Sequence, residues 1–526
     1  MNASASASAL PAAPSALPAR AWIGFVAMVF GNFMAILDIQ IVASSLNQIQ
    51  AGLSASAEEL TWVQTSYLIA EVIAIPLSGY LSRLLSTRIY FTISAIGFTL
   101  ASLACAFAWN IESMVVFRAL QGFLGGGMIP TTFAAMFMVF PPEKRTVPLV
   151  SLGLVSTLAP ALGPTIGGYL TAAFSWHWLF LINLLPGLLV AFAVWNLVHI
   201  DKPDWSLARR IDFIGLGLMA LFLGSLEYVL DEGPRHDWLE DATVRPLAFV
   251  AVITGAAFFW RSLTHHEPIV DLRVFRNRNF AAGSVVAFVV GVMLYGIVYL
   301  VPLFFGTVRG YSSLQIGHVM MVTGIAMFLS APLAGQAQKR LDLRLMLAYG
   351  LAAVSLGTFI NANLTAQSSL DQFFWPQILR GHGFMFCMVS MTGLALGTLR
   401  PEEMKNGSGL FNLMRNLGGA LGLAVINTLL SRLNSMHWSH LAETVNLSRT
   451  PVREAAMAAT GALSPALGTD AQPAAIGLFA QRVAQQALVM SFNDLLLIMA
   501  LLVASLAFLL PLIDKPQAEP GSAAAH

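Results

Sequence analysis

Five charged side chains lie inside long apolar stretches of the sequence: Asp38, Glu71, Arg118, Arg380 and Arg415. A charge at the centre of a lipid-facing helix costs about 2.5–3.5 kcal/mol or more. We therefore expect all five to face the interior of a helix bundle, either paired or hydrated. Burial disfavours the charged form of a carboxyl group and a neighbouring guanidinium favours it, so such a pair is suited to exchanging protons.

Three of these charges overlap in depth. At a rise of about 1.5 Å per residue, Asp38, Glu71 and Arg118 lie about 10, 15 and 9 Å below the outer ends of their helices. We predict that they carry or exchange protons. Each also has a structural interpretation: Asp38 as a hydrogen-bonding acid, Arg118 in an ion pair that pins helices together, and Glu71 in a salt bridge or as an attractor of cations.

A binding site for a small molecule inside the bundle would be largely apolar with few polar groups. The residues predicted to line it are Gln64, Glu71, Gln121, Asp38 and Arg380. The role of Arg415 stays open at this point. Three further acids, Glu227, Asp231 and Asp494, lie near the ends of apolar stretches, where contact with water is the expected explanation.

The amino-acid composition is that of a membrane protein. The chain has 526 residues, of which 57% are hydrophobic and 10% charged, with a mean hydropathy of +0.72. Soluble domains carry about 25% charged residues, so an ordinary soluble enzyme and a disordered protein are excluded. Lys and Arg number 28 against 27 Asp and Glu, which leaves no field to attract nucleic acid. The chain has two cysteines, and its sequence shows no catalytic set and no metal-ligand spacing. We therefore expect that it is not an enzyme and that it holds no metal or cofactor.

Fourteen apolar segments are long enough to cross a bilayer. They are 22–45, 61–82, 89–109, 112–138, 146–173, 177–199, 211–230, 246–264, 280–304, 314–337, 343–363, 373–397, 405–432 and 489–513. An even number places both termini on one side, and most Lys and Arg residues fall on that side. The short loops opposite hold only Arg235, Arg245 and Arg309, so we expect both termini to be cytoplasmic.

An internal repeat divides the chain. Pro76, Gly79 and Arg88 match Pro332, Gly335 and Arg344 at a constant offset of 256. Parallel repeats of this kind are typical of transporters. The predicted organisation is a disordered cytoplasmic tail at 1–20, a six-helix bundle at 21–199, a linker with two extra helices at 200–279, a second six-helix bundle at 280–513 with a long periplasmic loop at 433–488, and a cytoplasmic tail at 514–526.

Several motifs carry a family resemblance that covers about residues 22–513. They lie at 37–42, 62–68, 79–88, 118–122 and 159–168, the last reading Ala-Pro-Ala-Leu-Gly-Pro-Thr-Ile-Gly-Gly. The sequence resembles the major facilitator superfamily and, within it, the fourteen-helix drug:proton antiporters of the EmrB/QacA type, with the EmrB branch closer. The resemblance implies an all-α fold of two six-helix bundles plus two inserted helices.

The resemblance also implies a function. It is that of a proton-driven antiporter in the bacterial inner membrane that exports lipophilic or amphipathic toxic compounds with a periplasmic adaptor and an outer-membrane channel. The residues that it marks as conformational are Gly79, Arg83, Arg88, Gly163, Pro164, Gly167 and Gly168. The chain departs from the usual pattern at Ser82 and Ser86, where Asp and Gly are common, and at Glu71, where an apolar or amide residue is expected.

Other functions remain open. A single-substrate exporter of a fatty acid, an organic acid or a siderophore-like compound would share most of these features. A nutrient importer is opposed by the resemblance of 159–168 to a motif of exporters. A membrane receptor or sensor without transport activity would be expected to carry a signalling domain, which the sequence does not offer.

Overall fold

The computed structural model describes residues 18–43, 45–445 and 449–514, and this part of the chain is helical without a strand. The first half contains α1 (Ala19–Ala43), α2 (Leu46–Leu53), α3 (Ala57–Leu85), α4 (Thr87–Ala106), α5 (Ile111–Gly126), α6 (Met128–Val139), α7 (Thr146–Ala173), α8 (Trp178–Leu181) and α9 (Leu184–Leu197). The middle contains α10 (Phe213–Glu232) and α11 (Val244–Thr264). The second half contains α12 (Arg278–Thr307), α13 (Ser313–Arg340), α14 (Leu343–Ile360), α15 (Leu370–Leu396), α16 (Met404–Thr444), α17 (Thr450–Leu467) and α18 (Ala471–Ser505).

Short 3-10 helices connect or extend these elements. They are η1 (Pro142–Lys144), η2 (Trp205–Arg210), η3 (Gly233–Arg235), η4 (Trp238–Glu240), η5 (Leu272–Arg276), η6 (Asn361–Asn363), η7 (Gly468–Asp470) and η8 (Leu506–Leu512).

Among the described residues, twelve helical segments are long and apolar enough to cross a membrane. The other two predicted spans coincide with α7, of 28 residues, and α15, of 27 residues. The fourth predicted span is divided into α5 and α6 at Gly127, and the sixth into α8 and α9. The prediction of an all-α membrane protein is therefore confirmed.

The two halves repeat the same packing. In the first half α5 packs against α3 and α4, and in the second half α15 packs against α13 and α14. Both α3 and α13 begin with a capping box, in which Ser56 pairs with Glu59 and Ser312 with Gln315, and both contain an internal proline. The capping serines are separated by 256 residues, the same offset as in the sequence repeat.

The inserted helices form a pair at the side of the first half. Helices α10 and α11 pack against each other, and α10 also contacts α3 and α16. Helix α11 is mostly exposed along its length, with 22% of its most apolar stretch buried. Helix α10 is thus the inserted element that reaches the interior of the molecule.

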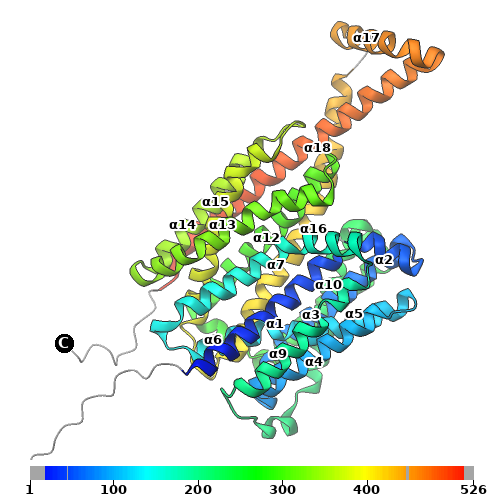
Figure 1. The fold of residues 1–526 in the computed structure, drawn as a ribbon. Helices are drawn as coiled ribbons and strands as arrows, with labels where there is room; N and C mark the ends of the chain where they lie inside the picture. The colour runs from blue at the N-terminus through cyan, green and yellow to red at the C-terminus, as the bar shows by residue number, and fades with distance from the viewer. Residues whose placement is uncertain (1–17, 44, 446–448, 515–526) are drawn as a thin grey trace, which may run out of the picture.

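The segment predicted as a long loop at 433–488 is instead mostly helical. Helix α16 continues to Thr444, α17 follows, and α18 starts at Ala471, so that the ends of α16 and α18 project beyond the bundle and carry α17 at their tip (Figure 1). Alanine-rich sequence such as that of α17 has a high helix propensity, which explains the difference. The predicted tails at 1–20 and 514–526 lie almost entirely outside the described residues.

Candidate functional site

Asp38 and Arg118 form a buried ion pair in the first half. Arg118 Nη1 donates to Asp38 Oδ2 at 2.6 Å, and neither side chain is exposed. The pair joins α1 to α5. A buried pair of this kind needs further hydrogen bonds to both partners. Such bonds are present, although Arg118 Nη2 has no partner among the described residues.

Two amides complete the surroundings of the carboxylate. Gln121 Nε2 donates to Asp38 Oδ1 at 3.0 Å, and Asn183 Nδ2 donates to the same oxygen at 2.8 Å. Asp38 therefore accepts hydrogen bonds from three side chains on two other segments. Asn183 was not among the predicted site residues, although it lies in an apolar stretch where a polar side chain needs a partner.

Arg118 is held in place by its own contacts. Its Nε donates to the Val63 carbonyl oxygen at 3.2 Å, Nη1 donates to Gln121 Oε1 at 2.6 Å, and the guanidinium carbon lies 4.2 Å from the centre of the Tyr67 ring. This geometry requires α3 and α5 to approach closely. Gly122 permits it, because a Cβ atom there would lie 2.3 Å from the Tyr67 carbonyl oxygen.

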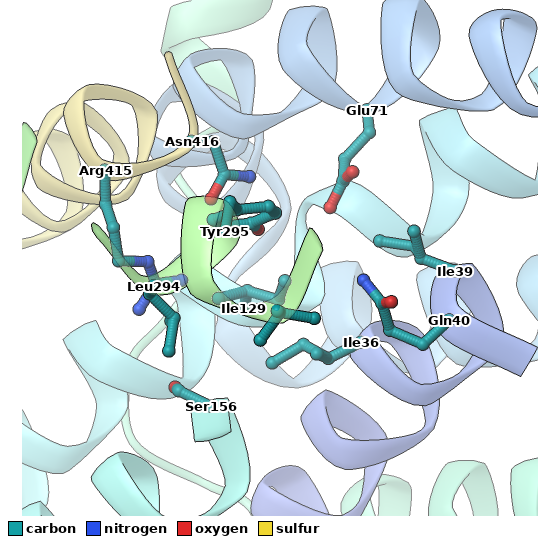
Figure 2. A pocket seen from close by; sticks show the side chains of 11 residues that line it. Ile36, Ile39, Gln40, Glu71, Ile129, Ser156, Leu294, Tyr295, Arg415 and Asn416 are labelled. Atoms are coloured by element: carbon teal, nitrogen blue, oxygen red, sulfur yellow. The ribbon is translucent and has the colours of Figure 1, made fainter. Parts of the chain in front are cut away.

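A cavity lies between the two halves (Figure 2). Glu71 on α3 points toward its centre, with Gln40 on α1 opposite and Tyr295, Arg415 and Asn416 on the side of the second half. The remaining lining is mostly apolar: Ile36, Ile39, Ile129, Ser156, Leu294 and Val298. An apolar wall with a few polar groups is typical of a site for an amphipathic ligand.

Glu71 is the notable polar group of this cavity. Its side chain is 4% exposed, and no hydrogen bond or ion pair joins it to another residue in the described part of the chain. Arg415 and Asn416 line the same cavity, and Arg415 Nη1 and Asn416 Oδ1 are buried with no hydrogen-bond partner among the described residues. Side chains of opposite charge with unsatisfied hydrogen-bonding capacity are therefore gathered around one cavity.

The cavity is narrow in this conformation. Its volume is about 20 Å³, which is on the order of one water molecule and far below the several hundred Å³ of a drug-sized site. A larger ligand can enter only if the two halves move apart.

The predicted substrate-lining residues are spread over four places. Glu71 lines the cavity, whereas Asp38 and Gln121 belong to the ion-pair network beside it. Gln64 lies on α3 outside the cavity lining, and Arg380 is fully buried on α15 within the second half. Gln40, Tyr295 and Asn416 line the cavity without having been predicted.

The expectation that Glu227 contacts water was wrong. It was expected to contact water at a helix end, but it is 5% exposed and faces the interior from α10. Asp231 accepts a hydrogen bond from the Thr65 hydroxyl, and Asp494 pairs with His437 at 2.7 Å while its side chain stays 43% exposed.

A second ion pair ties the halves together at the end where α3 stops and α16 starts. Lys405 Nζ lies 2.5 Å from Asp201 Oδ2 and 2.8 Å from the Ser82 carbonyl oxygen. Asp201 also accepts from the Thr87 backbone N–H at 3.0 Å. We call Lys405, Asp201 and Ser82 the Lys405 contact. The Lys405 contact therefore provides a charge interaction between the two halves, although the chain has Ser82 where Asp is common in the family.

The predicted conformational residues lie at or near helix contacts. A Cβ atom on Gly79 would lie 2.9 Å from the Lys405 carbonyl oxygen, and one on Gly163 would lie 2.3 Å from Gln40 Cβ. Arg88 Nη1 lies 2.8 Å from His199 Nε2, and Arg83 packs over the Tyr80 ring.

The remaining members of this set lie on α7, which contacts both halves through α1 and α13. Gly167 is buried there and Gly168 is partly exposed, while Pro164 lies in the same helix.

Two repeated bundles around a small interior site define the class of protein. The sequence matches the Major Facilitator Superfamily model over residues 28–423, and the chain belongs to that superfamily. Solved structures agree on the fold: the proton:xylose symporter XylE gives a TM-score of 0.58 at 12% identity, covering 93% of this chain and 96% of that one.

Within the superfamily, the chain is similar to EmrB proteins. It is 50% identical to "Colistin resistance protein EmrB" of Acinetobacter baumannii over 95% of this chain and 97% of that protein. It is 30% identical to "Multidrug export protein EmrB" of Escherichia coli K12, covering 89% and 91% of the two chains, and 30% identical to "Fatty acid resistance protein FarB" of Neisseria gonorrhoeae, covering 91% and 93%. The predicted resemblance is thereby confirmed.

Proposed function

We propose that this protein is a proton-driven multidrug exporter of lipophilic or amphipathic compounds, with the cavity around Glu71 as the substrate site. Similarity over nearly the whole chain to proteins named for multidrug export supports the export of toxic compounds. The observation that carries the assignment of the site is Glu71, which is 4% exposed, lines the cavity between the two halves and has no hydrogen bond or ion pair within the described part of the chain.

The Asp38–Arg118 pair is the proposed proton-coupling site. Asp38 lies on α1 between Ile36 and Gln40, which line the cavity, and Tyr67, which stacks on Arg118, lies one turn from Glu71 on α3. Protonation of Asp38 would remove the negative charge that balances Arg118 and would rearrange α1 and α3. The same two helices hold the substrate, so proton and substrate affinities would change together.

The transport cycle follows from the contacts between the halves. Breaking the Lys405 contact at one end would let the halves rock around the central cavity, as in other transporters built from repeats. In this cycle the substrate binds from the cytoplasm or inner leaflet, and a proton from the opposite side displaces it outward.

Localisation and partners complete the proposal. We place both termini on the cytoplasmic side of a bacterial inner membrane, which puts α17 in the periplasm. The projecting ends of α16 and α18 then offer a docking place for a periplasmic adaptor that leads to an outer-membrane channel (Figure 1).

A single-substrate exporter of fatty acids is the second candidate. Arg415 supports it, because this guanidinium lines the cavity and its Nη1 atom has no hydrogen-bond partner there. A carboxylate head group would satisfy it. The similarity to FarB points in the same direction.

Reconstituted protein tests these proposals. Proteoliposomes with an imposed pH gradient should accumulate lipophilic cations and neutral amphiphiles in proportion to the gradient. Transport that ignores the gradient would refute proton coupling. Transport restricted to fatty acids would favour the second candidate.

A further inference from the structure

The second half contains a buried arginine with no acidic partner among the residues that the structure describes. Arg380 on α15 is fully buried, and its only hydrogen bond that the structure records runs from Nη1 to Asn361 Oδ1 at 2.8 Å. Its Nε and Nη2 atoms are buried without a partner in the described part of the chain. A buried cation in this state is costly unless a negative charge lies beside it.

Comparison of the two halves shows which interaction Arg380 lacks. Arg118 lies on α5, which packs against α3 and α4, and Arg380 lies on α15, which packs in the same way against α13 and α14. In the first half Asp38 of α1 neutralises the arginine. Helix α12, the counterpart of α1, contains no Asp or Glu, and neither do α13, α14 or α7, which also pack near α15.

A second orphan donor lies beside Arg380. Gln377 is one turn earlier on α15 and therefore on the same face, and it is 1% exposed. Its Oε1 accepts from the Thr323 hydroxyl at 2.5 Å, which leaves Nε2 buried without a partner. The unsatisfied atoms here, Nε and Nη2 of Arg380 and Nε2 of Gln377, are all N–H donors.

Such a set of donors with a net positive charge is complementary to an anion. We propose that Arg380 and Gln377 form a binding site for a small inorganic anion such as chloride, which takes the place in the second half that the Asp38 carboxylate has in the first. Asn361 lies in η6, in the connection between α14 and α15, and is itself 2% exposed, so the site is enclosed where these two helices meet. The anion would hold α13, α14 and α15 together and is separate from the substrate cavity, whose lining does not include Arg380.

Thermal unfolding of the purified full-length protein tests the site. Chloride would be titrated against gluconate at constant ionic strength. The wild type should show a saturable rise in melting temperature of about 2 °C or more. Arg380→Gln should abolish this dependence, and Gln377→Leu should raise the chloride concentration that gives half of the effect. The absence of a chloride response in the wild type would overturn the proposal.

Asn361→Asp provides a test that does not depend on removing the arginine. It places a carboxylate where the amide oxygen now lies 2.8 Å from Arg380 Nη1. This internal anion should replace chloride, so the variant should melt higher than the wild type in gluconate and respond little to chloride. The control is Arg245→Gln, at an exposed position on α11, which should keep the full response. An unchanged response in Asn361→Asp, or a lost response in Arg245→Gln, would contradict an anion at Arg380.

Discussion

Lys405 Nζ of the second half lies 2.5 Å from Oδ2 of Asp201, a residue that follows the last helix of the first half. Both side chains are largely buried, with 8% and 14% exposed. The lysine also approaches the last turn of α3 through the Ser82 carbonyl oxygen, where the helix dipole favours a positive charge. One ammonium group therefore bridges three segments of the two halves.

Removing this ammonium group should loosen the end of the molecule at which it lies. We expect Lys405→Gln to destabilise the closed arrangement by about 1.5–3 kcal/mol, the range for a hydrogen bond to a charged group. Amide hydrogen exchange in residues 79–85 and 404–410 should then become about 10- to 150-fold faster. Arg400→Gln is the control, because Arg400 forms an exposed pair with Glu403 in the neighbouring turn and should contribute little. Equal effects of the two variants would show that the Lys405 contact does not hold the halves.

Neutralising Asp38 should impair both stability and coupling. Asp38→Asn leaves Arg118 buried without a counter-charge, a change that typically costs about 3–5 kcal/mol. We expect a lower melting temperature and the loss of pH-driven transport in proteoliposomes, with substrate binding retained. Asp371→Asn, at an exposed position at the start of α15, should behave like the wild type. If Asp38→Asn transports normally along a pH gradient, the pair is structural and another carboxyl group carries the proton.

Replacing Glu71 should change the choice of substrate. Glu71→Gln removes the negative charge from the cavity wall and keeps its shape. Lipophilic cations should bind at least about tenfold more weakly, which corresponds to about 1.4 kcal/mol, while neutral amphiphiles should change less than about twofold. Binding titrations on purified protein measure both, with the exposed Glu112→Gln as the control. Equal losses for cations and neutral compounds would exclude a charge-selective role for Glu71.

The sequence predicted the architecture well because its signals are local. Apolar length located the helices, and the matching prolines of α3 and α13 located the repeat. The cost of a charge in lipid identified Asp38 and Arg118 as interior residues, and the structure pairs them.

What the sequence could not predict depends on how helices are rotated and placed. Gln64 and Glu71 lie on the same helix, yet only Glu71 faces the cavity. Glu227 and Lys405 lie near helix ends, where hydropathy predicts contact with water, but neighbouring helices cover both side chains. Asp201 replaces the expected acid near Ser82 from a distant part of the chain, a substitution that no local motif can reveal.

Two glycines with opposite surroundings test whether close packing positions Arg118. A Cβ atom at Gly122 would lie 2.3 Å from the Tyr67 carbonyl oxygen, whereas at Gly217 it would meet nothing within 4 Å. Gly122→Ala should force α3 and α5 apart at a cost of about 1–3 kcal/mol, and the shift should lengthen the bond from Arg118 to the Val63 carbonyl oxygen and reduce transport. Gly217→Ala should instead stabilise α10 by up to about 1 kcal/mol through helix propensity, without affecting transport. Melting temperatures and proteoliposome transport measure both effects. If Gly122→Ala were as stable and as active as Gly217→Ala, the close approach of α3 and α5 would not be required to hold the ion pair.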